Sequence, residues 1–494
     1  MQSTLQGLLA DATLLRTGAY IDGRWIDADD GGRRAVTNPA TGEAVAEVAH
    51  CGTDETRRAI DAAERAQVDW CQTPAKERAN ALRRMFDLML AHADDLAAIL
   101  TAEQGKPLAE ARGEIVYGAN FLEWFAEEAK RVYGDTIPGP NPNTRIVTVR
   151  QGVGVVGCIT PWNFPNAMLT RKIGPALASG CTVVCKPAGA TPLSALAIAE
   201  IADRAGVPPG VVNVLAGRTD AIGAELTGNP KVRKLTFTGS TEVGKVLIGA
   251  CADTVKRVSM ELGGNAPFIV FDDADIDAAV QGALTSKYRN AGQTCVCTNR
   301  FLVQDGVFDE FAAKLAAAVA QLKMGNGMDA GVVVGPLIDR QAADDVLAMV
   351  DDAVAQGAGV ALGGSRGVQG EAFVEPTILT DVTADMRVFG EEIFGPVAPL
   401  MRFQDEAEAI ELANRTEFGL AAYFYSRDIG RVWRVAEGLE YGIVGINEGL
   451  ISNEAAPFGG MKASGNGREG SKYGLDEYTE IKYLCMGGID GGGP

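Results

Sequence analysis

Few side chains in this sequence could carry out covalent chemistry. Cys295 follows the segment Gly292-Gln-Thr, and Glu261 lies 34 residues earlier in Met260-Glu-Leu-Gly-Gly. A thiolate in a glycine-containing turn is a candidate nucleophile, and a carboxylate at the end of a strand is a candidate general base. Each also has an ordinary alternative, because most buried cysteines are small core residues and most glutamates are solvated.

The sequence offers few histidines for imidazole chemistry. His50 and His92 are the only histidines, and both lie far from every glycine-rich motif. A Ser-His-Asp or Cys-His mechanism, or a histidine-rich metal site, would have to use one of these two. The nine cysteines lack the paired spacings of zinc sites, which favours reduced thiols. We therefore expect neither a metal nor a catalytic histidine.

One glycine-rich string is a false dinucleotide fingerprint. Residues 152–157 read GVGVVG, but the two prolines at 161 and 165 follow at once. The fingerprint requires a turn from a strand into a helix, and two prolines four residues apart forbid a regular helix there. We interpret these residues as a strand.

A second string, GSTEVGKV at 239–246, comes within one residue of a P-loop. Val246 replaces the hydroxyl that would bind magnesium, and Glu242 would put negative charge in a phosphate cradle, which disfavours an NTPase. The string nevertheless follows an apolar strand and opens a helix. Backbone N–H groups near Gly239 and Ser240 could therefore hold a dinucleotide phosphate, with a ligand-free tight turn as the alternative.

Composition limits the class of protein and its partners. The chain has 494 residues, 47% of them hydrophobic and 22% charged, which is typical of a globular protein of several domains. A net charge of −19 repels nucleic acids and anionic lipids. No apolar run approaches the length of a membrane span. We expect a cytoplasmic protein with no nucleic-acid or membrane partner.

The elements that must position these residues follow from periodicity. The pattern predicts helices from Thr53 to Trp70 and from Pro74 to Glu103, and then a linker or protruding arm at Gly134–Asn143. From Cys181 to Leu262, short apolar strands alternate with helices, which favours a doubly wound parallel sheet. A second such series has predicted strands at PFIVF (267–271), FLVQ (301–304) and near Phe373, Val397, Ala421 and Ile443, with helices ending at Asn290 and beginning at Phe308. The sequence therefore predicts two α/β domains.

Ordered motifs from about Tyr20 to Tyr483 resemble the aldehyde dehydrogenase superfamily. Besides the segments around Glu261 and Cys295, they are Pro161-Trp-Asn-Phe-Pro165, Cys185-Lys-Pro187, Phe237-Thr-Gly-Ser240, Glu391-Glu-Ile-Phe-Gly-Pro396 and Pro457-Phe-Gly-Gly460. Within it, the succinate-semialdehyde dehydrogenase family is the most similar, through Leu169-Thr-Arg-Lys-Ile-Gly174, Ser286–Cys297, Ile451-Ser-Asn453 and Gly467–Tyr473.

The resemblance implies a covalent mechanism. Cys295 would attack the aldehyde carbonyl, and the Asn163 amide with the Cys295 backbone N–H would hold the oxyanion. Hydride would pass to a nicotinamide, leaving a thioester that Glu261 would hydrolyse by activating water, with Glu469 assisting. A CoA-acylating relative would release the thioester to CoA instead, and the presence of Glu261 favours water. A non-catalytic binding protein on this fold would lack Cys295 and Glu261.

The resemblance also implies a cofactor site. Lys186 and Glu392 would hold ribose hydroxyls and Phe394 would pack near the nicotinamide. The cleft would be lined by Thr160, Trp162, Gly239, Ser240 and Leu262. Many NAD-selective relatives have a glutamate three residues after the lysine, where this chain has Gly189. We therefore expect NADP to serve at least as well as NAD, but no added arginine enforces NADP, so NAD stays open.

Substrate selection is expected from Arg171, Arg289 and Ser452. Guanidinium groups bind carboxylates with two parallel hydrogen bonds, which suits an aldehyde with a distal carboxylate. The alternative is that both arginines form structural salt bridges. Succinate semialdehyde is the first choice, and glutarate semialdehyde or another omega-carboxylated aldehyde is the alternative, because one methylene discriminates by only about 1–3 kcal/mol.

Cys297 lies two residues after the candidate nucleophile. It is either a packing thiol or, as in similar enzymes, one half of a reversible Cys295–Cys297 disulfide that inactivates the enzyme under oxidation. So short a ring would be strained and easily reduced.

The resemblance finally implies domain boundaries and assembly. Residues 1–131 and 151–261 would form the dinucleotide-binding domain and 262–450 the catalytic domain. Residues 132–150 and 451–494 would form an oligomerisation β-arm and the C-terminal segment. Because such arms pair with a neighbouring subunit, we expect a homo-oligomer, either a dimer or a tetramer.

Overall fold

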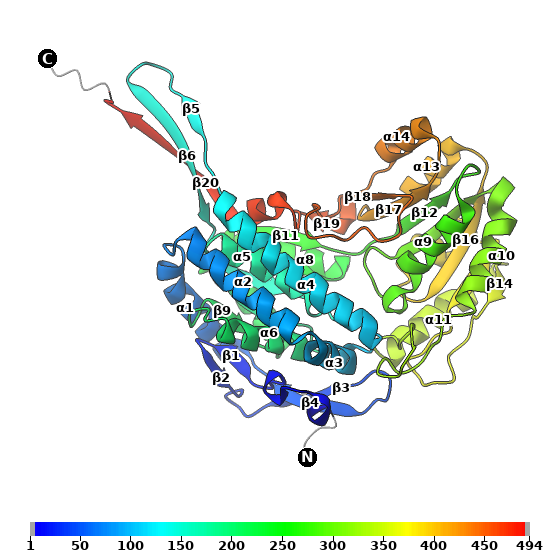
Figure 1. Cartoon of the computed structure of the whole chain (residues 1–494), viewed down its shortest axis with the longest axis horizontal. Coiled ribbons are helices and arrows are strands. Elements are labelled where there is room, and N and C mark those ends of the chain that lie inside the picture. Colours follow the sequence, from blue (N-terminus) through cyan, green and yellow to red (C-terminus); the bar gives the residue numbers. More distant parts are fainter. Residues whose placement is uncertain (1–4, 490–494) are drawn as a thin grey trace.

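The computed structural model describes residues 5–489 and consists of two α/β lobes with a protruding arm (Figure 1). The larger lobe contains an eight-stranded sheet. Its strand order is β19 (Gly465–Asn466), β11 (Arg257–Glu261), β10 (Val232–Thr238), β7 (Val155–Ile159), β8 (Thr182–Lys186), β9 (Val212–Val214), β1 (Ala19–Ile21) and β2 (Arg24–Ile26). The five strands from β11 to β9 are parallel, and the outer strands are antiparallel.

Helices cover both faces of this sheet. One face carries α2 (Ala75–Ala91), α3 (Ala93–Gln104), α4 (Leu108–Glu128), α5 (Ala167–Ala178) and α6 (Leu193–Arg204), which share one apolar core. The other face carries α1 (Thr53–Trp70), α7 (Thr219–Gly228) and α8 (Thr241–Cys251) over a second core. Strands β3 (Arg33–Thr37) and β4 (Ala44–Ala49) form a separate two-stranded sheet. The predicted doubly wound sheet is thus present, and residues 152–157 lead into β7 and not into a helix.

Two sequence expectations differ from the structure. The helix predicted from Pro74 to Glu103 is two helices, because the backbone of His92 leaves the helical region (φ −109°, ψ 19°). Near Phe373 there is no strand, only an isolated bridge between Arg366 and Val374, and the strand forms later as β15 (Thr377–Thr380). The helix predicted from Thr53 to Trp70 matches α1.

The smaller lobe is built on a seven-stranded sheet. Its order is β14 (Gly359–Leu362), β15, β16 (Val397–Phe403), β13 (Thr298–Gln304), β12 (Ala266–Val270), β17 (Ala421–Tyr425) and β18 (Ile443–Ile446). All pairs are parallel except β14–β15. Its helices are α9 (Ile276–Tyr288), α10 (Phe308–Val319), α11 (Arg340–Ala355), α12 (Arg387–Gly390), α13 (Glu406–Asn414) and α14 (Ile429–Gly438). The prediction of two doubly wound α/β units is confirmed.

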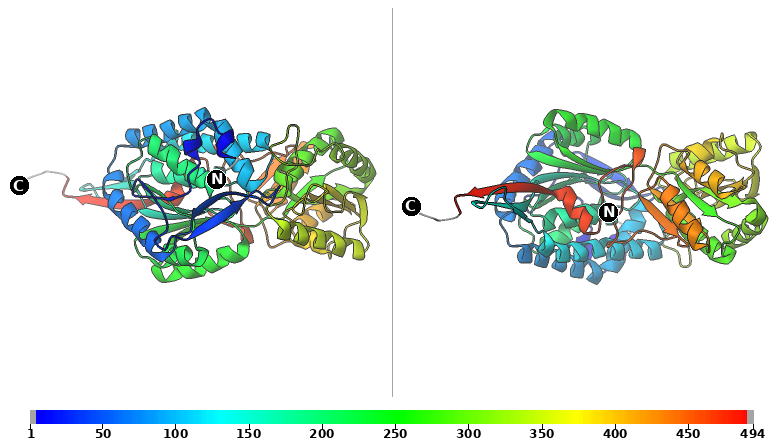
Figure 2. Two further views of the ribbon diagram at one scale, coloured as in Figure 1. Left: turned by 90° about the horizontal axis from the view of Figure 1, so that it is seen from below. Right: turned by 90° about the horizontal axis from the view of Figure 1, so that it is seen from above.

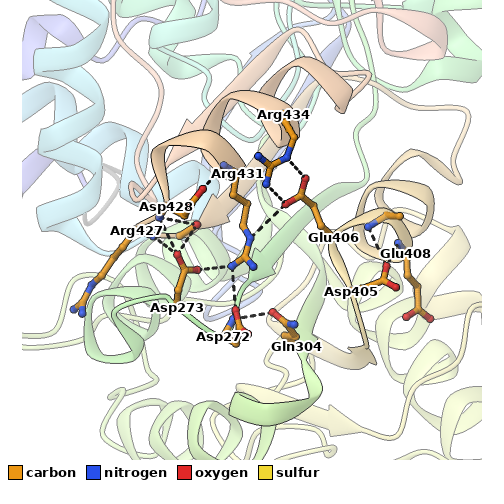
Figure 3. A network of polar contacts seen from close by, with 12 residues as sticks. Asp272, Asp273, Gln304, Asp405, Glu406, Glu408, Arg427, Asp428, Arg431 and Arg434 are labelled. Atoms are coloured by element: carbon orange, nitrogen blue, oxygen red, sulfur yellow. Dashed lines mark hydrogen bonds and ion pairs between the residues drawn. The ribbon is translucent and has the colours of Figure 1, made fainter.

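Helix α14 is anchored by ion pairs and contributes few buried residues. Arg431 contacts Asp272 at 3.0 Å and Asp273 at 2.7 Å, and Arg434 contacts Glu406 at 2.6 Å (Figure 3). Asp273 also accepts hydrogen bonds from the backbone N–H groups at the start of the helix. These contacts tie α14 to the segment that follows β12 and to α13.

The arm is a three-stranded antiparallel sheet of β5 (Thr136–Pro138), β6 (Thr144–Gly152) and β20 (Thr479–Gly487). It extends from the larger lobe on the side away from the smaller lobe (Figure 2). Gly134–Asn143, expected as a linker or an arm, holds β5 and the turn into β6. Strand β20 exposes apolar side chains such as Ile481 and Tyr483. Within residues 5–489, no helix combines the length and apolar character that a bilayer crossing needs.

Candidate active site

A cavity lies where the strand order of the larger sheet reverses. From β7 the chain proceeds to β8 and β9 on one side, whereas β10 and β11 lie on the other. Ligands of open α/β sheets bind at such a switch point, beyond the carboxyl ends of the strands. The cavity here has a volume of about 240 Å³. It is lined by Pro161, Trp162, Asn163, Thr238, Gly239, Ser240, Glu261, Leu262, Gly263, Cys295, Glu392 and Phe394.

The loop before Cys295 is held in an uncommon conformation. Asn290 and Ala291 have left-handed backbones, with φ of 51° and 53°. The Asn290 side-chain amide donates to the carbonyls of Asn163 at 3.0 Å and Gln293 at 3.1 Å, and buried Gln293 donates to the carbonyl of Asn290 at 3.0 Å. These bonds compensate the strain of the left-handed residues. They fix the segment that presents Cys295, partly exposed, to the cavity.

The electrostatic surroundings of Cys295 favour the thiol at rest. Burial raises its pKa to about 12, and the carboxylates of Glu392 and Glu261 add to this, while the positive charge of Arg171 opposes it. A thiolate therefore needs a proton acceptor close by or a further positive charge in the cavity. The Cys295 backbone N–H makes no hydrogen bond within residues 5–489, which leaves it available as a donor.

Glu261 is a buried carboxyl at the end of β11, beside the last residue of β10 in register. Its Oε2 has no partner within the described residues. Burial raises its pKa well above the usual value, and the negative charge of Glu469 raises it further. A carboxyl with a raised pKa and a free oxygen facing a cavity is suited to proton transfer near neutral pH.

Glu469 is held in place by two consecutive cations of α5. Its carboxylate lies 2.8 Å from the Arg171 guanidinium and 2.6 Å from the Lys172 ammonium, and all three side chains are buried. Burial alone would raise the Glu469 pKa, but the charges of Lys172 and Arg171 outweigh it and the pKa is lowered. Glu469 therefore carries the negative charge that keeps Glu261 protonated to a higher pH.

Asn163 is positioned in part by Lys106 and Glu114, to which no pattern in the sequence pointed. The Asn163 side-chain amide donates to the backbone carbonyl of Gln293 at 3.0 Å. The backbone carbonyl of Asn163 accepts a hydrogen bond from Lys106 Nζ at 2.7 Å. Buried Lys106 is paired with Glu114 at 2.6 Å. Glu114 in turn accepts from the backbone N–H of Asn166 at 2.9 Å, at the start of α5. This chain of contacts joins α4, α5 and the loop before Cys295.

The other side of the cavity suits a dinucleotide. Ser240 caps the N-terminus of α8 through its hydroxyl, and the buried hydroxyls of Thr160 and Thr238 have no partner within residues 5–489. Trp162 and Phe394 meet edge to face with centroids 5.5 Å apart, which forms an aromatic wall. A helix N-terminus, unpartnered hydroxyls and an aromatic wall match the phosphate, ribose and ring parts of NAD or NADP.

Glu392 lines this side of the cavity, whereas Lys186 is not among the lining residues and is joined to this wall by a hydrogen bond from the Thr160 backbone N–H to its carbonyl. Glu392 accepts from the backbone N–H of Gly264 at 3.1 Å, and burial raises its pKa to about 7. Lys186 ends β8, and burial followed by the positive charge of Arg34 lowers its pKa to about 8. Arg34, which lies on β3 far away in the sequence, is therefore an arginine close to the cofactor lysine that no sequence motif indicated.

A second cavity of about 250 Å³ lies on the other side of the Asn163–Phe164 segment, which contributes Asn163 to the first cavity and Phe164 to this one. It is lined by Lys106, Glu110, Gly113, Glu114, Tyr117, Phe164, Arg289, Leu450 and Ser452. The Arg289 guanidinium lies 5.4 Å from the Phe164 ring and forms no ion pair within residues 5–489. Nearby Glu110 instead accepts from the backbone N–H of Asn290 at 2.8 Å.

The three predicted substrate residues differ in their placement. Arg289 and Ser452 line the second cavity, whereas Arg171 is buried, paired with Glu469 and packed 4.0 Å from the Phe458 ring. Burial raises the pKa of the Tyr117 phenol, and the positive charges of Arg171 and Arg289 oppose this rise. Tyr117 lines the second cavity together with Arg289 and Ser452, and no sequence motif pointed to it.

Cys297 is buried, and its thiol donates to the carbonyls of Lys287 and Thr298, both at 3.4 Å. Burial raises its pKa. All nine cysteines are free thiols, so the expected Cys295–Cys297 disulfide stays a prediction for oxidising conditions. Within residues 5–489, no three His, Cys, Asp or Glu side chains are grouped as metal ligands would be.

Comparisons with known proteins agree with this geometry. The aldehyde dehydrogenase family matches residues 25–484. The chain is 63% identical to glutarate-semialdehyde dehydrogenase of Pseudomonas aeruginosa, over 97% of this chain and 100% of the relative. It is 62% identical to succinate-semialdehyde dehydrogenase (NADP(+)) GabD of Escherichia coli, over 97% and 99%. The crystal structure of succinate-semialdehyde dehydrogenase from Burkholderia pseudomallei superimposes with a TM-score of 0.97 at 61% identity, over 97% and 100%.

Proposed function

The chain belongs to the aldehyde dehydrogenase family, and we propose that it oxidises aldehydes that carry a distal carboxylate, with succinate semialdehyde as the preferred substrate. The general reaction is that of the family, NAD(P)-dependent oxidation of an aldehyde. The observation that supports the finer proposal is the guanidinium of Arg289, which has no ion pair among the described residues and lies with Ser452 in a cavity next to the nucleophile loop.

Cys295 begins the proposed reaction. Its Sγ forms a bond to the carbonyl carbon, and its thiol proton leaves to a base in the cavity. The Asn163 amide and the free Cys295 N–H would then donate to the oxyanion, and preorganised donors of this kind are usually the largest single contribution to such catalysis. When bound, the nicotinamide ring of NAD or NADP accepts the hydride that leaves the same carbon. What remains on Cys295 is a thioester.

Glu261 completes the proposed cycle. Its free oxygen takes a proton from a water molecule, the water oxygen bonds to the thioester carbon, and the carbon–sulfur bond breaks to release the acid and Cys295. The raised pKa of Glu261 makes it a stronger base than a solvated glutamate once it is ionised. Asn163 keeps its position for both steps because Lys106 holds its backbone carbonyl.

Cofactor binding would use the opposite wall of the first cavity. Glu392 and Lys186 would take ribose hydroxyls, and Trp162 and Phe394 would enclose the nicotinamide. Thr160, Gly239, Ser240 and Leu262 would line the cleft around the phosphates. This assignment is supported by the unpartnered hydroxyls and by the capped N-terminus of α8.

Glutarate semialdehyde is the second candidate, and a specific observation favours it. A relative at 63% identity bears that name, slightly above the 62% of the succinate-semialdehyde relative. The second cavity, at about 250 Å³, has room for one more methylene. Because a methylene changes affinity by only about 1–3 kcal/mol, both aldehydes are expected to react. The ratio of their kcat/KM values identifies the preferred substrate.

The test is steady-state nicotinamide reduction with succinate semialdehyde, glutarate semialdehyde, butanal and pentanal. We expect kcat/KM to be at least 100-fold higher for the carboxylated aldehydes than for the neutral ones of equal length. Cys295→Ala should abolish turnover with all four. Equal kcat/KM for succinate semialdehyde and butanal would refute recognition of the carboxylate and leave only the general reaction.

The boundaries proposed above place the cofactor on the larger lobe and the nucleophile on the smaller one, and the arm would join subunits. The exposed apolar residues of β20 support a homo-oligomer. Light scattering on the purified protein distinguishes a dimer from a tetramer, and a monomer would contradict the proposal.

A further inference from the structure

Two cations lie together at the carboxyl end of β8. Within residues 5–489, the side chain of buried Lys186 makes one hydrogen bond, from Nζ to the carbonyl of Pro187 at 3.3 Å, and no ion pair. Arg34, exposed on β3, forms no ion pair or side-chain hydrogen bond within residues 5–489. The charge of Arg34 lowers the pKa of Lys186, so the two groups are close enough to repel each other.

Two other cations of the same lobe have carboxylate partners. Arg33, the neighbour of Arg34 on the same strand, pairs with Asp27 at 2.6 Å. Arg58, on α1, pairs with Asp29 at 2.6 Å. The chain has 64 acidic residues against 45 basic ones, so carboxylates are available. In the described part of the chain none of them pairs with Arg34 or Lys186, which leaves a site of net positive charge.

Gly189 provides the space for the Arg34 guanidinium. A Cβ atom at position 189 would lie 2.6 Å from Arg34 Nη1 and 2.9 Å from Arg34 Cζ. Any side chain there would displace the guanidinium. The position of the Arg34 guanidinium therefore depends on the absence of a side chain at Gly189, although 155 residues separate the two positions in the sequence.

This positive site adjoins the first cavity. The backbone N–H of Thr160 donates to the carbonyl of Lys186 at 3.2 Å, and the Thr191 hydroxyl donates to the carbonyl of Trp162 at 3.5 Å. The turn that contains Gly189 is thus bonded to the Thr160–Trp162 wall of the cofactor cleft.

We propose that Arg34, together with Lys186, binds the 2′-phosphate of NADP and makes Arg34 the residue that selects NADP over NAD. This inference rests on the proposed function. A guanidinium binds phosphate oxygens with parallel charge-assisted hydrogen bonds, and the phosphate removes the repulsion between the two cations. NAD carries a hydroxyl at the same position and gains neither effect. Gly189 is needed because a side chain at this position would occupy the space of the Arg34 guanidinium.

The test measures binding directly, by isothermal titration of the full-length protein with NADP+, NAD+, 2′,5′-ADP and 5′-AMP. Arg34→Leu should weaken NADP+ and 2′,5′-ADP by about 10–100-fold, the range for loss of one or two charge-assisted bonds. NAD+ and 5′-AMP should change less than twofold. Gly189→Ala should weaken NADP+ in the same direction, because its methyl group displaces the guanidinium. Arg33→Leu is the matched control and should leave all four affinities unchanged.

Each outcome decides the inference. Unchanged NADP+ affinity in Arg34→Leu, or an equal loss for NAD+, would overturn it, provided that thermal unfolding shows the variant folded. If the wild type oxidises aldehydes but binds NAD+ and NADP+ equally, the inference fails while the proposed function stands. If the wild type binds neither cofactor and oxidises no aldehyde, both fail together.

Discussion

Replacing Arg289 by leucine tests substrate recognition most directly. The guanidinium lines the second cavity and forms no ion pair within residues 5–489, and in the proposed function a substrate carboxylate is its counter-ion. Two charge-assisted N–H···O bonds contribute about 1.5–3 kcal/mol each. Ser452 still donates in the variant and water enters the vacated space, so we take the lower end of the sum, about 3 kcal/mol. Arg289→Leu should therefore lower kcat/KM for succinate semialdehyde by roughly 100-fold or slightly more.

The control is a neutral substrate in the same assay. Butanal lacks the carboxylate, so its kcat/KM should change less than threefold, or rise because leucine is apolar. Arg289→Lys keeps the charge but loses the planar fork, and it should cost about tenfold for succinate semialdehyde only. An equal loss for butanal would show that Arg289 maintains the nucleophile loop and does not bind the substrate, which refutes the reasoning.

Three other perturbations follow from the buried charges. Lys106→Met leaves the Glu114 carboxylate buried without its partner and should lower the free energy of unfolding by about 3–5 kcal/mol in urea denaturation; a loss below about 1 kcal/mol would contradict this. Glu469→Gln removes a charge that raises the Glu261 pKa, so the acidic limb of the kcat–pH profile should move to lower pH, and an unmoved limb would exclude this coupling. Cys297→Ala should abolish the recovery by thiol of peroxide-inactivated enzyme; recovery equal to that of the wild type would rule out the disulfide.

Local signals in the sequence predicted the elements well where local physics decides them. The helix at Thr53–Trp70 has acidic residues in its first turn and an apolar face, and the structure has the same bounds. The break at His92 was missed because the periodicity continues through it. What stabilises the break is tertiary: Asp95, at the start of α3, accepts from the backbone N–H groups of Ala10 and Asp11.

The residues of the candidate site likewise fall into those that local sequence motifs indicate and those that only the tertiary structure brings together. The residues that line the first cavity belong to short motifs, so Cys295 and Glu261 could be identified from the residues next to them in the sequence. The position of Arg34 could not be predicted in this way, because only the tertiary structure brings β3 next to the turn after β8. Nor could the support of Asn163 by Lys106, because nothing in a sequence shows that a lysine is buried. The pairing of Arg171 with Glu469 likewise joins residues 298 positions apart.

The placement of β19 affects how the protein is made. This strand completes the edge of the eight-stranded sheet by pairing with β11, yet it is synthesised about 200 residues later. At 5–20 residues per second, the ribosome needs roughly 10–40 s for that stretch. During this interval the β11 edge, with Glu261 at its end, has no partner strand and can pair with another nascent chain. Chaperone occupancy on ribosomes is therefore expected to be highest between the emergence of β11 and that of β19.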